Sequence, residues 1–230
     1  IKETIRIFDE VTQFIKPGKT EKDVSDFIKG LVEQRGFGLA WDEEHCPAVF
    51  TGPDSAGAHS GPTNRVIEQG HILNIDFGLN INGYCSDLQR TWYILRENEL
   101  VPPAEVLHGF NTILESVTLS AEALKPGKLG CEIDDVARNY IVSNGYSEYP
   151  HALGHQIGRV AHDGGALLSP RWERYGNLPY MPVEKNQVFT IEPRLSVPGY
   201  GVATVEEEVL ITDDGCKFIS ERQKEIYLVR

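Results

Sequence analysis

The chain contains the same local pattern twice, and a duplicated pattern restricts the folds that it can adopt. Ile15–Lys19 reads Ile-Lys-Pro-Gly-Lys, and Leu124–Lys128 reads Leu-Lys-Pro-Gly-Lys. Each segment lies between two stretches in which apolar residues recur at helical spacing. The second stretch of each pair ends in a glycine and an aromatic residue, Gly36-Phe37 and Gly145-Tyr146, as at a glycine helix C-cap. Because the match needs no gap, it favours two related half-domains. Two unrelated helix pairs with common loop chemistry are the alternative.

The paired prolines Pro102-Pro103 mark the joint between these halves, which cover about residues 1–100 and 103–230. After each helix pair the pattern changes to β-branched and apolar strands. The first pair of strands is His71–Leu79 and Tyr84–Leu95, and the second is Val188–Leu195 and Val202–Thr212. We therefore predict an α+β fold, a single domain over residues 1–230. Its two pseudo-symmetric helix–helix–hairpin halves share one curved antiparallel sheet.

Charge and composition exclude several classes of partner. The net charge of −12 argues against nucleic acid, because phosphate binding needs a basic surface. No apolar run approaches the roughly 20 residues needed to cross a bilayer, so we expect no membrane partner. The four cysteines form no CxxC pair and are typical of free thiols in a reducing compartment. We therefore expect a cytoplasmic protein.

Four acidic residues interrupt the predicted apolar strands at matching places in the two hairpins. Asp76 and Asp87 lie on the first hairpin, and Glu192 and Glu206 on the second. His155, between two glycines, is a fifth candidate. Buried carboxylates at close range repel one another unless cations neutralise them. Carboxylate oxygens with a single imidazole suit Mn²⁺, Co²⁺, Zn²⁺ or Fe²⁺. The pattern therefore predicts a site for two divalent cations.

Taken singly, three of these residues also have ordinary interpretations. Asp87 is typical of a turn, Glu206 of a solvated acidic run, and His155 of a satisfied core histidine. The matching positions on two hairpins favour a shared site over these readings.

Five segments together resemble the catalytic domain of the creatinase, prolidase and methionine aminopeptidase family, whose fold is called pita-bread. The resemblance spans nearly the whole chain and is closest to prolidase and Xaa-Pro aminopeptidase. The segments occur in the family's order and are Asn74–Gly78, Gly83–Thr91, Gly154–Gly158, Phe189–Pro193 and Val205–Thr212.

The resemblance assigns a role to each candidate ligand. It implies that Asp76 binds one metal, that Asp87 and Glu206 bridge two metals, and that His155 and Glu192 bind the second metal. It also selects Glu206 from the acidic run. Mn²⁺ is the first expectation for the cofactor, with Co²⁺, Zn²⁺ or Fe²⁺ as alternatives.

The resemblance implies three catalytic residues and a reaction. His59 and His162 are expected beside the substrate and the tetrahedral intermediate, and Glu192 is expected to move the proton. The reaction is cleavage of an N-terminal residue or of a dipeptide, ahead of proline, by a metal-bridged hydroxide. Hydrolysis of a small non-peptide amide and a non-catalytic peptidase-like binding domain are the alternatives.

Two positions depart from the family pattern. Arg194 follows Glu192-Pro193 where relatives have glycine, and Thr204 occupies the place of an arginine usual in Xaa-Pro enzymes. These departures bear on the substrate more than on the metals. We expect a small peptide as substrate, a homodimer as the assembly, and no family N-terminal domain before this segment.

Overall fold

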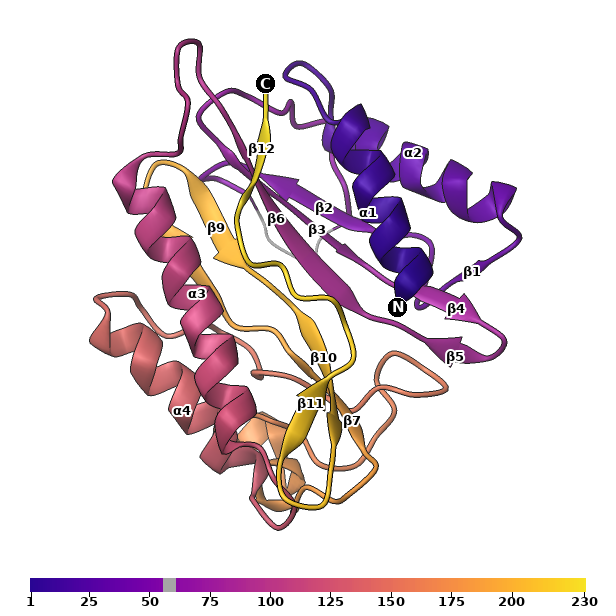
Figure 1. The fold of residues 1–230 in the computed structure, drawn as a ribbon, viewed down its shortest axis with the longest axis vertical. Coiled ribbons are helices and arrows are strands. Elements are labelled where there is room, and N and C mark those ends of the chain that lie inside the picture. The colour runs from indigo at the N-terminus through magenta and orange to yellow at the C-terminus, as the bar shows by residue number, and fades with distance from the viewer. Residues whose placement is uncertain (56–60) are drawn as a thin grey trace.

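The computed structural model describes residues 1–55 and 61–230. Its four α-helices form two pairs, drawn in indigo and in magenta to pink in Figure 1. The pairs are α1 (Lys2–Phe14) with α2 (Glu21–Gln34), and α3 (Ala104–Ala123) with α4 (Gly130–Ser143). In these described ranges, no helix is long and apolar enough to cross a membrane.

The strands fall in two groups separated by the second helix pair. The first group is β1 (Gly38–Leu39), β2 (Ala48–Thr51), β3 (Ile72–Phe77), β4 (Leu79–Ile81), β5 (Tyr84–Cys85) and β6 (Leu88–Ile94). The second group is β7 (Val188–Ile191), β8 (Arg194–Val197), β9 (Gly201–Thr204), β10 (Glu207–Ile211), β11 (Cys216–Phe218) and β12 (Tyr227–Val229). Two short 3-10 helices, η1 (Glu173–Tyr175) and η2 (Leu178–Tyr180), precede β7.

The expected hairpins are present, but the described strands form four ladders rather than one continuous sheet. The ladders have the orders β12-β6-β3-β2, β1-β4-β5, β11-β10-β7 and β8-β9. The first hairpin pairs β3 with β6, and the second divides into β7 with β10 and β8 with β9. An isolated bridge between Gln89 and Glu206 links the ladder that contains β6 to the start of β10.

The last strand corrects the prediction of a purely antiparallel sheet. β12 runs parallel to β6, with Tyr227 opposite Trp92. The chain returns from the second strand group before adding this strand, and so approaches the edge of the first ladder in the parallel direction. Side-chain alternation marks a strand but not its direction, so the sequence pattern could not reveal this pairing.

The apolar core has two clusters, one for each helix pair. Phe8 of α1 packs on Phe77 of β3 with ring centroids 5.8 Å apart, and on Trp92 of β6. In the other cluster α3 packs on strands β7 to β9, and α4 packs on α3. Ile72, Tyr93 and Leu95 come from the first strand group but belong to the second cluster, so the two clusters are joined.

The duplicated loops adopt similar local conformations. Gly18 and Gly127 both have positive φ, 90° and 85°, which an L side chain rarely adopts. The helices that follow them, α2 and α4, are each 14 residues long. α1 and α3 differ, at 13 and 20 residues. The relation between two complete halves therefore stays a prediction.

Candidate metal centre

The four predicted acids lie at strand ends where the two strand groups meet. Asp76 is in β3 and Asp87 immediately precedes β6, whereas Glu192 follows β7 and Glu206 precedes β10. The backbone N–H of Glu206 donates to the carbonyl of Gln89 at 3.1 Å. This bridge places the start of β10 beside the start of β6, which draws acids from the two hairpins together.

His155 reaches the same place from the segment before β7. Its carbonyl accepts the backbone N–H of Thr190 at 2.9 Å, and the N–H of Glu192 donates to the carbonyl of Leu153 at 2.7 Å. A Cβ on Gly154 would lie only 2.0 Å from the Thr190 carbonyl oxygen. Glycine at 154 therefore permits the close backbone approach that aligns His155 with Glu192.

Three of the five candidates form a tight group of possible ligand atoms. One ligand atom from each of Asp87, His155 and Glu206 lies within 4.8 Å of the other two, and all three residues are buried. His155 Nε2 lies 3.4 Å from a carboxylate oxygen of Glu192 and 3.7 Å from one of Asp87. Asp76 interacts with the Asp87 side chain. The structure thus brings all five predicted ligands into one cluster.

Oxygen atoms of this cluster lack partners of the kind that buried carboxylates usually have. Among the described residues, Asp76 Oδ1, Asp87 Oδ1 and Glu206 Oε1 are buried and accept no hydrogen bond. Buried polar atoms are nearly always satisfied, because leaving one unpaired costs about 1–3 kcal/mol and more for a charge. Unpaired oxygens from three acids beside one imidazole fit divalent cations of the Mn²⁺ to Zn²⁺ series.

The protonation behaviour of the cluster agrees with a site built for cations. Burial raises the pKa of Asp76 to about 7. Burial, and next the charge of Asp76, raises the pKa of Glu192 well above its usual range. The pKa of Asp87 and of Glu206 rises in the same way, first from burial and then from neighbouring carboxylates. The protein alone therefore does not stabilise four negative charges here.

The His155 ring is oriented as a ligand rather than as a cation. Its Nδ1 lies 3.1 Å from the carbonyl oxygen of Gln156, which can only accept, so Nδ1 carries the proton. Nε2 then carries the free lone pair, and this lone pair faces Asp87 and Glu192. Burial, and next the charge of His162, lowers the pKa of His155 to about 4. Because the ring is neutral at pH 7, its contacts with Asp87 and Glu192 are not ion pairs. Instead, Nε2 and the carboxylate oxygens form a set of possible metal ligands.

The acidic run 206–208 is buried, contrary to the interpretation of such a run as a solvated edge. Glu207 pairs with Arg90 at 3.2 Å and accepts from Ser220, and the Glu208 carboxylate accepts the N–H of Asp87 at 2.8 Å. Glu206 alone of the three keeps an unpaired buried oxygen. The contacts thus distinguish Glu206 as the candidate ligand, in agreement with the family pattern.

A buried arginine that the sequence analysis missed supports this junction. Arg90 donates to the carbonyls of Gln89, Glu206 and Glu221 as well as to Glu207, and it is 1 % exposed. It therefore ties β6 to the start of β10 and to the chain before β12. An arginine inside the apolar stretch of β6 was the available signal, because an arginine is rarely buried without partners.

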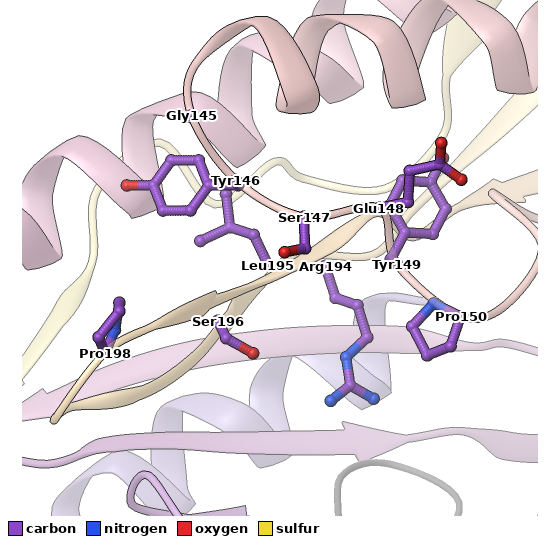
Figure 2. A pocket seen from close by; sticks show the side chains of 10 residues that line it. All are labelled: Gly145, Tyr146, Ser147, Glu148, Tyr149, Pro150, Arg194, Leu195, Ser196 and Pro198. Carbon is purple, nitrogen blue, oxygen red and sulfur yellow. The ribbon is translucent and has the colours of Figure 1, made fainter.

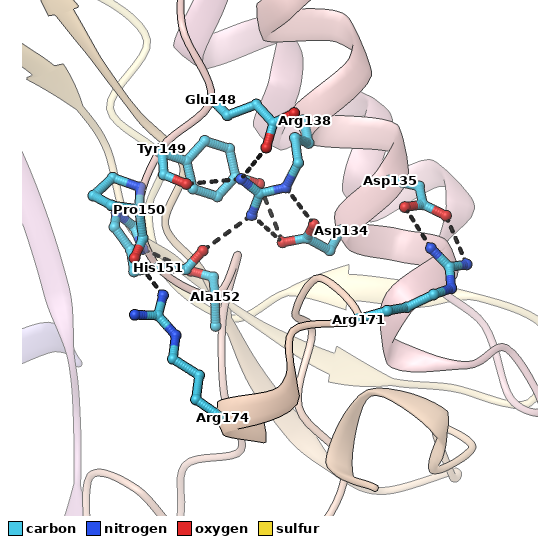
Figure 3. Close-up of polar contacts among 10 residues, drawn as sticks. All are labelled: Asp134, Asp135, Arg138, Glu148, Tyr149, Pro150, His151, Ala152, Arg171 and Arg174. Atoms are coloured by element: carbon cyan, nitrogen blue, oxygen red, sulfur yellow. Dashed lines mark hydrogen bonds and ion pairs between the residues drawn. The ribbon is translucent and has the colours of Figure 1, made fainter. Parts of the chain in front are cut away.

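A second buried arginine holds the segment that leads to His155. Arg138 of α4 donates to both carboxylate oxygens of Asp134 and to the carbonyls of Tyr149 and His151, as Figure 3 shows. Its guanidinium also lies 4.0 Å from the centroid of the Tyr149 ring. The bidentate pair and the two carbonyl contacts fix the chain four residues before the candidate ligand.

The two predicted catalytic histidines have different outcomes. The ring of His162 lies against that of His155, with centroids 4.1 Å apart, so it is at the cluster. His59 falls in residues 56–60 and lies outside the described residues. Its predicted place beside the substrate stays a prediction.

Comparison with known proteins assigns the chain to a family. The model of metallopeptidase family M24 matches residues 2–213, so the chain belongs to that family. Its fold is similar to that of solved relatives: the X-Pro aminopeptidase of Thermotoga maritima superposes with a TM-score of 0.86 at 31% identity, covering 100% of this chain and 61% of that one.

Other relatives agree with this placement. The Xaa-Pro dipeptidase of Bacillus anthracis has a TM-score of 0.83 at 29% identity, covering 97% of this chain and 59% of that one. An uncharacterized peptidase of Staphylococcus aureus is 32% identical over 213 residues, which are 92% of this chain and 56% of that protein. The chain thus spans only about half the length of the curated relatives it matches.

Proposed function

We propose that this chain is a dinuclear metal-dependent peptidase that removes an N-terminal residue or splits a dipeptide, ahead of proline. The observation that supports this most strongly is the meeting of Asp87, His155 and Glu206 within 4.8 Å, with unpaired buried carboxylate oxygens beside them. Solved relatives named X-Pro aminopeptidase and Xaa-Pro dipeptidase supply the reaction class.

Each ligand would have a defined place. Asp76 would help to hold one cation, His155 and Glu192 would help to hold the second, and Asp87 and Glu206 would contribute to both. Mn²⁺ is the first candidate, and Co²⁺, Zn²⁺ or Fe²⁺ would suit the same donors. When bound, such cations lower the pKa of water and polarise a carbonyl oxygen.

The chain's own residues would orient these partners and move protons. Glu192 Oε1 lies within reach of both His155 Nε2 and Thr190 Oγ1, and its side chain is 21% exposed against 7% for Asp87. This greater exposure favours Glu192 as the carboxylate that accepts a proton from water and passes it to the leaving nitrogen. His162, against the His155 ring, would donate toward the oxygen of the tetrahedral intermediate.

Two further expectations belong to this proposal. A homodimer follows from the general frequency of twofold assemblies. A cytoplasmic location would suit the free cysteines, Cys46, Cys85, Cys131 and Cys216, none of which forms a disulfide in the described residues. A pseudo-symmetric relation between the two halves would explain why each supplies two acids.

The proposal is tested by hydrolysis of Ala-Pro and of Ala-Pro-Ala, with the chain loaded with Mn²⁺ and then stripped by a chelator. We expect cleavage that needs the metal and that falls by at least about 100-fold in Asp87→Asn. Undiminished hydrolysis by this variant would exclude the centre. A parallel panel of N-acylated and cyclic amides tests the non-peptide alternative, which predicts cleavage there and none of the peptides. Failure to cleave any of them, with no metal retained, would favour a binding domain.

A further inference from the structure

A cavity of about 410 Å³ lies beside the segment that leads to the metal centre. Residues 145–150 line one side and Arg194, Leu195, Ser196 and Pro198 line the other, as Figure 2 shows. Tyr146 and Tyr149 give this cavity apolar walls, and two serines give it small polar groups. It has the mixed lining that is common in ligand-binding pockets.

Arg194 is the cation among the residues that line this cavity. Among the described residues it makes no ion pair and no hydrogen bond through its side chain. The one acid in the lining, Glu148, points away from it in Figure 2 and lies 3.7 Å from Arg138 instead. A half-buried guanidinium without an acid is unusual, because burying a charge is costly unless it is paired.

The position of Arg194 on its strand relates the cavity to the metal centre. Glu192 and Arg194 are two residues apart and both half-buried, while Pro193 between them is buried. In extended chain, residues i and i+2 point to one face and their Cα atoms lie roughly 6.6 Å apart. The guanidinium thus extends from the same side of the chain as the Glu192 carboxylate.

The residue opposite Arg194 cannot supply this charge. Arg194 pairs with Thr204 across β8 and β9. Thr204 Oγ1 lies 2.7 Å from Gln89 Oε1 and 2.9 Å from the Pro193 carbonyl, so its single proton is used inside the protein. The Arg194–Thr204 pair lies two residues from Glu192 on one strand and two residues from Glu206 on the other. Of these two side chains, only Arg194 offers a charge to a ligand.

We infer that Arg194 binds a carboxylate of the substrate, borne by the residue that follows the scissile bond. A guanidinium holds a carboxylate through two parallel hydrogen bonds, which fix both direction and charge. A residue spans at most about 3.6 Å, so a carboxylate one residue beyond a bond held at the centre is within reach of this long side chain. The inference rests on the proposed function for the placement of that bond.

The carboxylate could be the free end of a dipeptide or an acidic side chain, and binding of uncleavable peptides separates these sources. Calorimetric titration of the Mn²⁺-loaded chain would compare the reduced-bond analogue of Ala-Pro with its C-terminal amide. A second pair, the reduced-bond amides of Ala-Glu and Ala-Gln, tests the side chain. In one of the two pairs, we expect the compound with the carboxylate to bind with a Kd about tenfold or more lower than that of its neutral counterpart.

Substitution then assigns the preference to Arg194. In Arg194→Gln we expect the two members of the preferred pair to bind within about twofold of each other, and in Arg194→Lys part of the preference to return. Arg6→Gln removes the same charge from an exposed side chain of α1 outside this cavity and should keep the full preference. Circular dichroism and a thermal melt check that each variant folds.

The outcomes distinguish this inference from the proposed function. Absence of any carboxylate preference in the unaltered chain, or a preference that survives in both Arg194 variants, overturns the inference even if Xaa-Pro peptides are cleaved. A preference lost in Arg194→Gln upholds it even if the chain cleaves none of the peptides, in which case the proposed reaction fails instead.

Discussion

At the scale of single residues, the three consecutive glutamates show how contacts divide similar side chains among different tasks. Glu207 neutralises Arg90, Glu208 accepts the backbone N–H of Asp87, and Glu206 adds charge to the acid cluster. Glu207 and Glu208 therefore have partners within the protein that offset part of the cost of their burial, whereas Glu206 raises the free energy of the folded chain until a cation binds.

This division predicts opposite effects of the same substitution at neighbouring positions. With metal removed by a chelator, Glu206→Gln should leave the free energy of unfolding unchanged or raise it, because it relieves repulsion among acids. Glu207→Gln should lower it by about 3–5 kcal/mol, because Arg90 loses the charge that compensates its burial. Urea unfolding of the two variants measures this. Equal losses at both positions would contradict the assignment of Glu206.

A surface histidine gives a prediction for pH. His45 Nδ1 lies 2.6 Å from Asp42, and this hydrogen bond, followed by the charge of Asp42, raises the pKa of His45 above its usual 6.5. Because the folded pKa is raised, the contribution is fully present below pH 6.5 and is lost as pH rises through the folded value. NMR titration should give a His45 midpoint above 6.5 that falls in Asp42→Asn. A midpoint unchanged by that variant would exclude the pair.

At the scale of elements, the junction of β6 with β10 depends on one buried side chain. Arg90 makes its contacts to four residues that lie beyond β6 or at its start. Replacing it by an apolar residue leaves Glu207 buried without a counter-charge and removes donors from three carbonyls.

Arg90→Met should therefore lower the free energy of unfolding by about 3–5 kcal/mol and reduce metal retention with it. Arg171→Gln is the matched control, because its pair with Asp135 is at the surface and should be worth about 0–1 kcal/mol. Chemical denaturation of both variants makes the comparison. A loss at Arg90 no larger than at Arg171 would show that the junction does not depend on this network.

Two glycines test the close approach of the His155 segment to β7. An added Cβ at Gly154 would lie 2.0 Å from the Thr190 carbonyl oxygen, whereas one at Gly30 of α2 would meet nothing within 4 Å. Gly154→Ala should cost more than about 2 kcal/mol and displace His155. Gly30→Ala should stabilise by roughly 0.4–1 kcal/mol through backbone entropy. Thermal melts decide, and tolerance of alanine at 154 would contradict the described backbone contact.

At the scale of the molecule, the candidate metal centre lies where the two core clusters join. Its ligands come from β3, from the starts of β6 and β10, from the end of β7 and from the segment before β7. A ligand that binds only the folded chain stabilises it by about 2.7 kcal/mol when present at 100 times its Kd. Metal held at this centre would therefore stabilise the whole chain.

Removal of metal should lower the melting temperature by roughly 5–10 °C in a chain of this size. The same chelator should have no effect on Asp87→Asn, which cannot form the centre. Scanning calorimetry with and without chelator measures both. A chelator effect of equal size in this variant would place the stabilising ion elsewhere.

The sequence was sufficient for some features of this arrangement and insufficient for others. Local chemistry marked the loops at Pro17-Gly18 and Pro126-Gly127, the helices after them and the acids inside apolar strands. It could not show that β12 pairs parallel with β6, because register and direction depend on contacts between distant segments. For the same reason, the sequence did not reveal the partners of Arg90 or Arg138. It also suggested that the acidic run 206–208 is exposed, although these glutamates are buried.

Anomalous scattering of crystals grown with Mn²⁺, measured at the manganese absorption edge, would show directly whether these five residues bind metal. We expect two peaks among Asp76, Asp87, His155, Glu192 and Glu206. The exposed group Asp42, Glu44 and His45 provides an internal comparison, since its ligand atoms also lie within 4.8 Å of one another. A peak only at that exposed group, or none among the five buried and half-buried ligands, would exclude the proposed metal centre.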